Sequence, residues 1–214
     1  MKCVAIGFVL FVVSNFSYGA HIQLHNGTEI EVCKDIFKLR LSNTTKNFSE
    51  AINLIADENG IPKWEEGLLL RNPKYLEKSA YFDIDNDGID ESVSSLFTWL
   101  SGNPGEYYRV IEQDKLKAFN RFTERDLYSL PGLYSYHPWP YRDLGVFFFS
   151  ISPFKFKGTF YLGLKDNNFG KEEFMERSFL IVKYSNEMLD FGQNNYGKTS
   201  NIEVVCKFVY ANKS

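Results

Sequence analysis

The sequence predicts a single α+β domain in which short N-terminal helices are followed by a mainly antiparallel β-sheet. The clearest helical periodicity lies in the first third of the chain, whereas the rest reads as short strands bounded by Gly, Pro, Asn and Asp. Residues 20–214 comprise 195 residues (214 − 19), enough for one domain with a proper core and too few for two comfortable ones. Aromatic residues make up 17% of the chain, which indicates a core built largely of rings.

Residues 1–19 have the features of a secretory signal peptide. Lys2 supplies a positive charge, Val4–Val13 is almost unbroken apolar sequence, and Ser17 and Gly19 place small residues around a cleavage site. We expect cleavage after Gly19 and a periplasmic or secreted protein. The alternative is a transmembrane anchor, but the apolar stretch falls short of the roughly 20 residues that a spanning helix needs, and no later segment is long enough.

The first elements after the signal are a hairpin and two helices. Residues 22–32 alternate apolar and polar side chains around Asn26-Gly27, the preferred pair for a two-residue turn, so we expect a small hairpin there. A short helix from about Cys33 to Leu41 follows. The next helix has the strongest local signals, because Asn47 is a suitable N-cap and Glu50 stands three residues later. Its apolar residues share one face (Phe48, Ala51, Ile52, Ile55 and Ala56), and it stops at Asn59-Gly60 and Pro62.

The remaining elements are predicted to be mostly strands. These are Trp64–Leu70, Lys78–Asp83, Ser92–Leu100, Tyr107–Ile111, Val146–Ile151, Thr159–Leu164, Phe179–Tyr184 and Glu203–Tyr210. In the last strand Val204, Cys206 and Phe208 share one face, so Cys206 is expected to point inward. Gln113–Arg125 is expected to form a short polar helix, and Leu130–Asp143 is an aromatic, Pro-rich segment that packs on its own sheet or, alternatively, docks a sugar or protein.

The number of cysteines is consistent with an exported protein. Cys3 lies in the signal, which leaves Cys33 and Cys206 as a pair in a compartment that permits disulfides. We predict that they bond, closing a loop of 173 residues (206 − 33) and tying the first element to the last. The alternative is two buried free thiols, since unpaired Cys is also among the most buried residue types.

Residues 83–91, with the sequence DIDNDGIDE, carry five carboxylates around one glycine. Calcium takes six to eight oxygen ligands on a tightly turning backbone, and odd positions of such a loop point inward. Side-chain ligands are therefore expected from Asp83, Asp85 and Asp87, with the backbone carbonyl of Ile89 and a closing carboxylate from Glu91. An EF-hand fits poorly, because its twelfth position would be Ser94 and the flanking sequence is strand-like. The alternative to a Ca²⁺ site is a solvated Asp/Asn turn.

The thirteen residues 81–93 resemble the D-x-D-x-D-G-x-x-[DE] loop of FG-GAP and VCBS-type modules. That loop joins two strands of a hairpin and binds Ca²⁺ in integrin α-chain propellers. The resemblance implies calcium ligands at Asp83, Asp85, Asp87 and Glu91, with Asp90 as an outward neighbour. Propellers repeat the loop in several blades and this chain has one copy, so the resemblance does not extend to propeller function.

These observations favour binding over catalysis. The formal net charge is −3 with both signs scattered along the chain, so nothing resembles a nucleic-acid-binding surface. The sequence contains neither G-x-S-x-G nor H-E-x-x-H. We expect an exported, non-enzymatic calcium-binding module that binds a protein partner in the cell envelope, for instance as an inhibitor or immunity-type protein. The alternative is a hydrolase of envelope polymers that uses acidic residues in a cleft.

Overall fold

The computed structural model describes residues 21–66, 76–100, 103–111, 132–134, 149–166, 178–190 and 198–211. The predicted signal peptide over residues 1–19 and the predicted helix Gln113–Arg125 lie outside this part of the chain. Neither of the two helices in the described ranges has the length and apolar character that crossing a bilayer requires.

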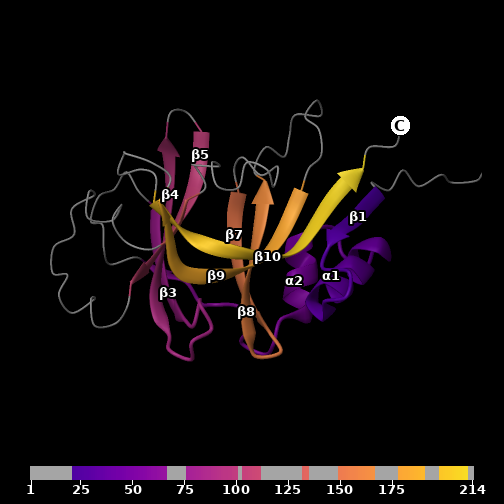
Figure 1. Ribbon diagram of the computed structural model, residues 1–214, viewed down its shortest axis with the longest axis horizontal. Helices are drawn as coiled ribbons and strands as arrows, with labels where there is room; N and C mark the ends of the chain where they lie inside the picture. The colour runs from indigo at the N-terminus through magenta and orange to yellow at the C-terminus, as the bar shows by residue number, and fades with distance from the viewer. Residues whose placement is uncertain are drawn as a thin grey trace, which may run out of the picture.

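The strands of the described residues form two antiparallel sheets (Figure 1). The first sheet has the order β1-β10-β9-β8-β7, with β1 (His21–Asn26), β10 (Lys198–Ala211), β9 (Ser178–Asp190), β8 (Thr159–Asp166) and β7 (Phe149–Phe156). The second has the order β2-β3-β4-β5-β6, with β2 (Glu65–Glu66), β3 (Leu76–Phe82), β4 (Glu91–Leu100), β5 (Asn103–Ile111) and β6 (Gly132–Tyr134). The α+β class is therefore as predicted, with the strands divided between two sheets.

Helices α1 (Glu31–Leu41) and α2 (Phe48–Ile55) follow β1. The predicted cap of α2 is confirmed: Asn47 Oδ1 accepts a hydrogen bond from Glu50 N at 2.9 Å, and the Glu50 carboxylate accepts one from Lys46 N at 2.7 Å. The helix ends before the Asn59-Gly60 stop signal. The reason is a tertiary bond, because Asp57 N donates to the carbonyl of Lys155 in β7 at 2.8 Å.

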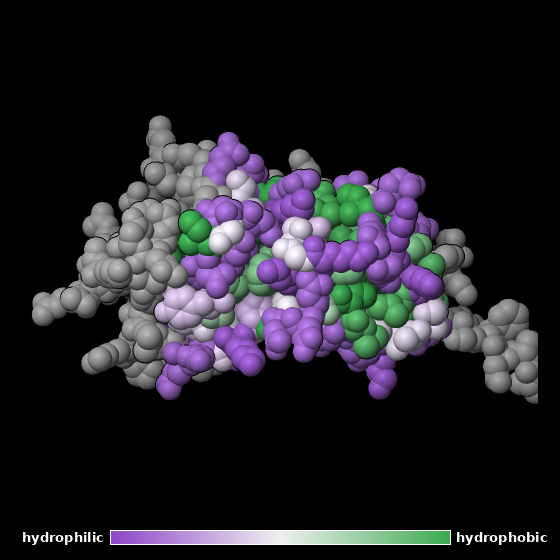
Figure 2. All heavy atoms as spheres, turned by 90° about the horizontal axis from the view of Figure 1, so that it is seen from below, coloured by the Kyte–Doolittle hydropathy of each residue, from purple (hydrophilic) through white to green (hydrophobic). Residues whose placement is uncertain are grey.

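The first sheet is the middle layer of the molecule, with the two helices on one face and the second sheet on the other (Figure 1). Strand β9 shows this alternation. Phe179 and Ile181 pack in the cluster that includes the helices, and the intervening Leu180 and Val182 pack in the cluster shared with the second sheet. A strand buried on both faces explains the unbroken apolar run at this point of the sequence. Seen from below, apolar atoms gather towards the end that carries the helices (Figure 2).

The predicted disulfide between Cys33 and Cys206 is present, with both residues fully buried and their Cα atoms 5.7 Å apart. It lies in the core between α1 and β10. Cys206 points inward as predicted, but Val205 is buried as well. The pairing of β10 with β9 shifts register between Val204 and Cys206, and such a bulge breaks the strict alternation of faces.

The hairpin predicted over residues 22–32 is wrong. Strand β1 pairs with β10, and the chain turns after Asn26 and enters α1 at Glu31. Glycine is required at position 27, but not for the two-residue hairpin turn that the sequence predicts. It has φ +79°, and a Cβ added to it would lie 2.3 Å from the carbonyl oxygen of Val205 and 2.5 Å from Cys33 Sγ.

The later strands agree with the predictions in position and are mostly longer. Of the predicted strand Trp64–Leu70, the described part contains only β2. Strand β6 falls inside the segment Leu130–Asp143, whose other residues lie outside the described ranges, as do residues 146–148. The loop between β3 and β4 and the turn between β7 and β8 both lie at the lower end of Figure 1.

Candidate metal centre

The loop over residues 83–90 joins β3 to β4, as the sequence predicts. Phe82, the last residue of β3, pairs with Glu91, the first residue of β4. This register brings the two ends of the acidic segment together. Gly88 has φ +92°, the left-handed conformation that a tight turn needs and that glycine adopts without strain.

Three carboxylates of this segment converge. One oxygen from each of Asp83, Asp85 and Glu91 lies within 4.8 Å of the others. Calcium–oxygen bonds of 2.3 to 2.6 Å allow two ligands on opposite sides of one ion to be about 5 Å apart. The spacing of the three groups is therefore close to what one Ca²⁺ ion between them would require.

The second observation at this site concerns Asp83. Its Oδ2 accepts a hydrogen bond from Gly88 N at 3.0 Å, but its Oδ1 is buried and has no hydrogen-bond partner. A buried acceptor without a partner costs free energy, on the order of 1 to 3 kcal/mol. A bound cation would supply the missing interaction, so the residues present fit a hard metal ion.

Glu91 is the most buried ligand candidate, with 4% of its surface exposed. Burial raises the pKa of this carboxyl group to about 7, and the charges of Asp85, Asp87 and Asp83 add to the rise. A hydrogen bond from Ile84 N to Glu91 Oε2 at 3.1 Å acts in the opposite direction. Burial is also the largest reason for the raised pKa of Asp85. The raised pKa values of both groups reflect burial and the nearness of other negative charges.

The two other predicted ligands lie outside the converging group. Asp87 is exposed and its Oδ1 accepts a hydrogen bond from Ile89 N at 2.8 Å, which is a local turn bond. Asp87 N in turn donates to Asp85 Oδ1 at 3.2 Å. Ile89 is 61% exposed. Of the five predicted ligands, the structure brings together Asp83, Asp85 and Glu91.

Sequence reasoning missed two residues that hold the loop in place. Ile84 is 1% exposed and packs in the core between the sheets. Asn86, at φ +65°, extends its amide to β8, where its Nδ2 donates to the carbonyl of Phe160 at 3.1 Å and its Oδ1 accepts from Phe160 N at 2.6 Å. An apolar residue between two acids was an available signal for Ile84, but nothing local indicates a partner 74 residues further on for Asn86.

The remaining candidate residues are the two cysteines and the aromatic segment. Cys33 and Cys206 form the disulfide. Tyr136, Trp139 and Tyr141 of the aromatic segment lie outside the described residues. Comparison with known proteins adds no family: no protein-family model, no curated protein and no solved structure matches this chain.

Proposed function

We propose that this chain is an exported calcium-binding protein without enzymatic activity, and that the cation fixes one hairpin of a protein-binding module in the cell envelope. The observation that carries the cation is the buried, unbonded Oδ1 of Asp83, a residue whose carboxylate converges with those of Asp85 and Glu91. The FG-GAP-like spacing of residues 83–91 supports the same ion. Export is supported by residues 1–19 and by the disulfide.

The position of the site favours a structural role for the ion. Its three carboxylates come from the residue after β3, from the loop and from the first residue of β4. An ion bound to them would join both ends of the hairpin loop and oppose their mutual repulsion. The same loop is bonded to β8 through Asn86, so the ion would also fix how the second sheet meets the first.

The hydrolase alternative requires two carboxylates that converge on a substrate. A cleft beside β3 is lined by Glu65 and Glu66, which are consecutive residues of β2. Side chains of consecutive strand residues point to opposite faces, so these two do not converge on one bond. Asp85 and Glu91 have raised pKa values, but the proposed ion would use them as ligands. We therefore propose binding in preference to hydrolysis.

Calcium titration by calorimetry tests the proposal. We expect saturable binding by the parent protein, with a dissociation constant between about 10⁻⁶ and 10⁻³ M. Asp85→Ala should abolish the heats, and Asp87→Ala, outside the converging group, should weaken binding much less. Equal heats from the parent and Asp85→Ala, or no rise in the melting temperature of the parent with calcium, would remove the metal from the proposal.

A further inference from the structure

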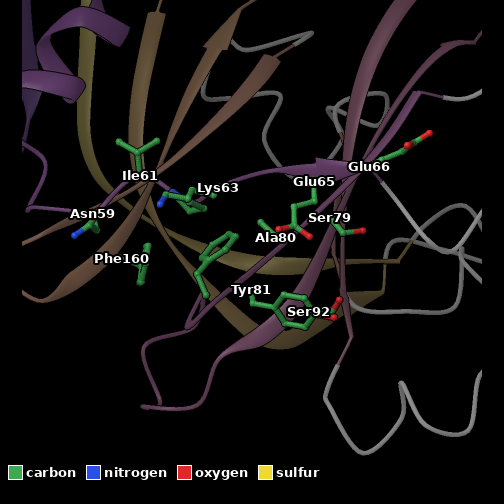
Figure 3. A pocket seen from close by; sticks show the side chains of 12 residues that line it. Asn59, Ile61, Lys63, Glu65, Glu66, Ser79, Ala80, Tyr81, Ser92 and Phe160 are labelled. Atoms are coloured by element: carbon green, nitrogen blue, oxygen red, sulfur yellow. The ribbon is translucent and has the colours of Figure 1, made fainter.

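A cleft of about 370 Å³ lies beside the edge of β3, next to the candidate metal centre (Figure 3). One wall is formed by Ala80–Phe82 of β3, and the other by residues 59–63, which lead into β2. Phe160 of β8 also lines it. The volume falls in the range of sites that bind small ligands or a few residues of a peptide.

At the cleft, the pairing between β2 and β3 stops. Strand β2 pairs with β3 only through Glu65 with Ser79 and Glu66 with Lys78. If the pairing continued in register, Lys63 would stand opposite Tyr81. Instead the pairing ends at Glu65, and the ring of the preceding Trp64 packs against Phe82 at 6.3 Å and against Tyr108 at 5.4 Å between ring centres.

Within the described part of the chain, Ala80–Phe82 therefore have no strand partner on the β2 side, because β2 pairs with β3 only at Lys78 and Ser79. Alternate residues of a strand direct their N–H and C=O groups to the same edge. One of Tyr81 and Phe82 therefore directs its backbone N–H and C=O to this edge, where the described residues provide no strand partner.

The side chains around this edge define what would fit. Ala80, Phe82 and Phe160 are buried and form an apolar floor. Tyr81 is 57% exposed on the opposite face of the strand, where it would pair with a side chain of an added strand. Lys63 and Glu65 line the cleft, are both exposed and have no hydrogen-bond or ion-pair partner in the described part of the chain.

We propose that this cleft binds an extended peptide segment of a partner protein by strand addition to β3. The peptide would direct alternate side chains to the apolar floor and towards Tyr81, and would carry a carboxylate near Lys63 and a cation near Glu65. This inference names the protein-binding surface of the proposed function, and it rests on that function only for its dependence on calcium.

Calcium dependence follows from how closely the cleft adjoins the acidic loop. Phe82 directly precedes Asp83 and Ser92 directly follows Glu91, and both line the cleft. The Phe160 backbone is bonded to Asn86 of the loop. An ion that fixes the loop would therefore fix two walls of the cleft, so a peptide that needs those walls binds more tightly when the ion is present.

The test selects a displayed library of random linear peptides of about seven residues against the full, calcium-loaded protein. Selected peptides are synthesised, and their affinity is measured by fluorescence anisotropy with calcium and with excess EGTA. Lys63→Glu should weaken peptides that carry a carboxylate about tenfold, whereas Lys34→Glu on α1 should leave them unchanged. Alternate amides of the peptide can be N-methylated in two ways. Methylation of the set that faces β3 should abolish binding, and methylation of the other set should not.

Three results would overturn strand addition: no peptide selected, binding unaffected by Lys63→Glu, or binding insensitive to N-methylation of either set of amides. Circular dichroism of Lys63→Glu excludes misfolding as the cause of a loss. Calcium binding in calorimetry without peptide binding would refute this inference and leave the metal centre intact. Peptide binding that EGTA does not weaken would refute the coupling between the two sites.

Discussion

Asp83→Asn should reverse the order of stability between two conditions. In excess EGTA the variant should be more stable than the parent, and in saturating calcium it should be less stable. The reason is that Asp83 serves the protein only when an ion is bound: without one, its charge repels two neighbours and its Oδ1 is buried without a partner. The asparagine oxygen retains the ability to accept the hydrogen bond from Gly88 N.

The magnitude follows from the spacing of the group. At 4.8 Å, two unit charges repel each other by about 0.9 kcal/mol in water and by about 3.5 kcal/mol at an effective dielectric constant of 20. Loss of the Asp83 charge removes its repulsion with two neighbours, so it should stabilise the calcium-free protein by about 2 to 7 kcal/mol. Calcium at a hundredfold excess over its dissociation constant should stabilise the parent by about 2.7 kcal/mol, and the variant by far less.

Urea unfolding followed by tryptophan fluorescence measures both free energies. The pH should be above 7, so that Glu91 is largely ionised. Asp90→Asn is the matched control, because Asp90 is an exposed acid on the same loop outside the converging group. Calcium should stabilise the Asp90→Asn variant almost as much as it stabilises the parent. The reasoning is refuted if Asp83→Asn destabilises the calcium-free protein, or if calcium stabilises this variant as much as the parent.

Three further predictions concern the disulfide, the hydrogen bonds between Asn86 and β8, and the pH dependence of stability. Replacing Cys33 and Cys206 with alanine should lower the free energy of unfolding by on the order of 5 kcal/mol, because the bond closes a 173-residue loop; a loss below about 1 kcal/mol in urea would contradict this. Asn86→Gly keeps a left-handed backbone available but removes both hydrogen bonds to β8, so it should cost about 1 to 3 kcal/mol and weaken calcium binding in calorimetry. Asn59→Gly, at φ +58° with no such bonds, is its control, and equal losses would show that the amide is unimportant. Without calcium, the stability contributed by protonated Glu91 should be present below its ordinary pKa of 4.5 and be lost as the pH rises through about 7, because the folded state binds the proton more tightly. Melting temperatures of the parent and Glu91→Gln across this range check the sign: the parent should lose more stability with rising pH, and identical slopes would contradict it.

Local patterns were sufficient for the elements whose signals are local. The cap of α2 lies within four residues of the sequence, and the acidic spacing placed Asp83, Asp85 and Glu91 on one hairpin. Asp87 has the same spacing but lies outside the converging group, and its Oδ1 accepts a hydrogen bond from Ile89 N. Spacing alone does not distinguish a ligand from a turn residue.

The failures have a common cause in pairing between distant segments. Residues 28–32 alternate over only five positions, which is too short to separate a strand from the start of a helix. The helix forms because Val32, Cys33 and Ile36 lie on the face of α1 that is buried against the first sheet. The pairing of β1 with β10 and the bond of Asn86 to β8 likewise depend on contacts that no window of sequence contains.

The position of the disulfide has a consequence for proteolysis. Of the helices and strands that the structure describes, all except β1 lie at least partly between Cys33 and Cys206 in the sequence. A single cut of the backbone anywhere from residue 34 to residue 205 therefore yields two pieces that remain one covalent molecule. Such a nicked protein would migrate at full mass without reductant and separate into fragments only with it, so a single cut inside the disulfide loop would not by itself release any strand.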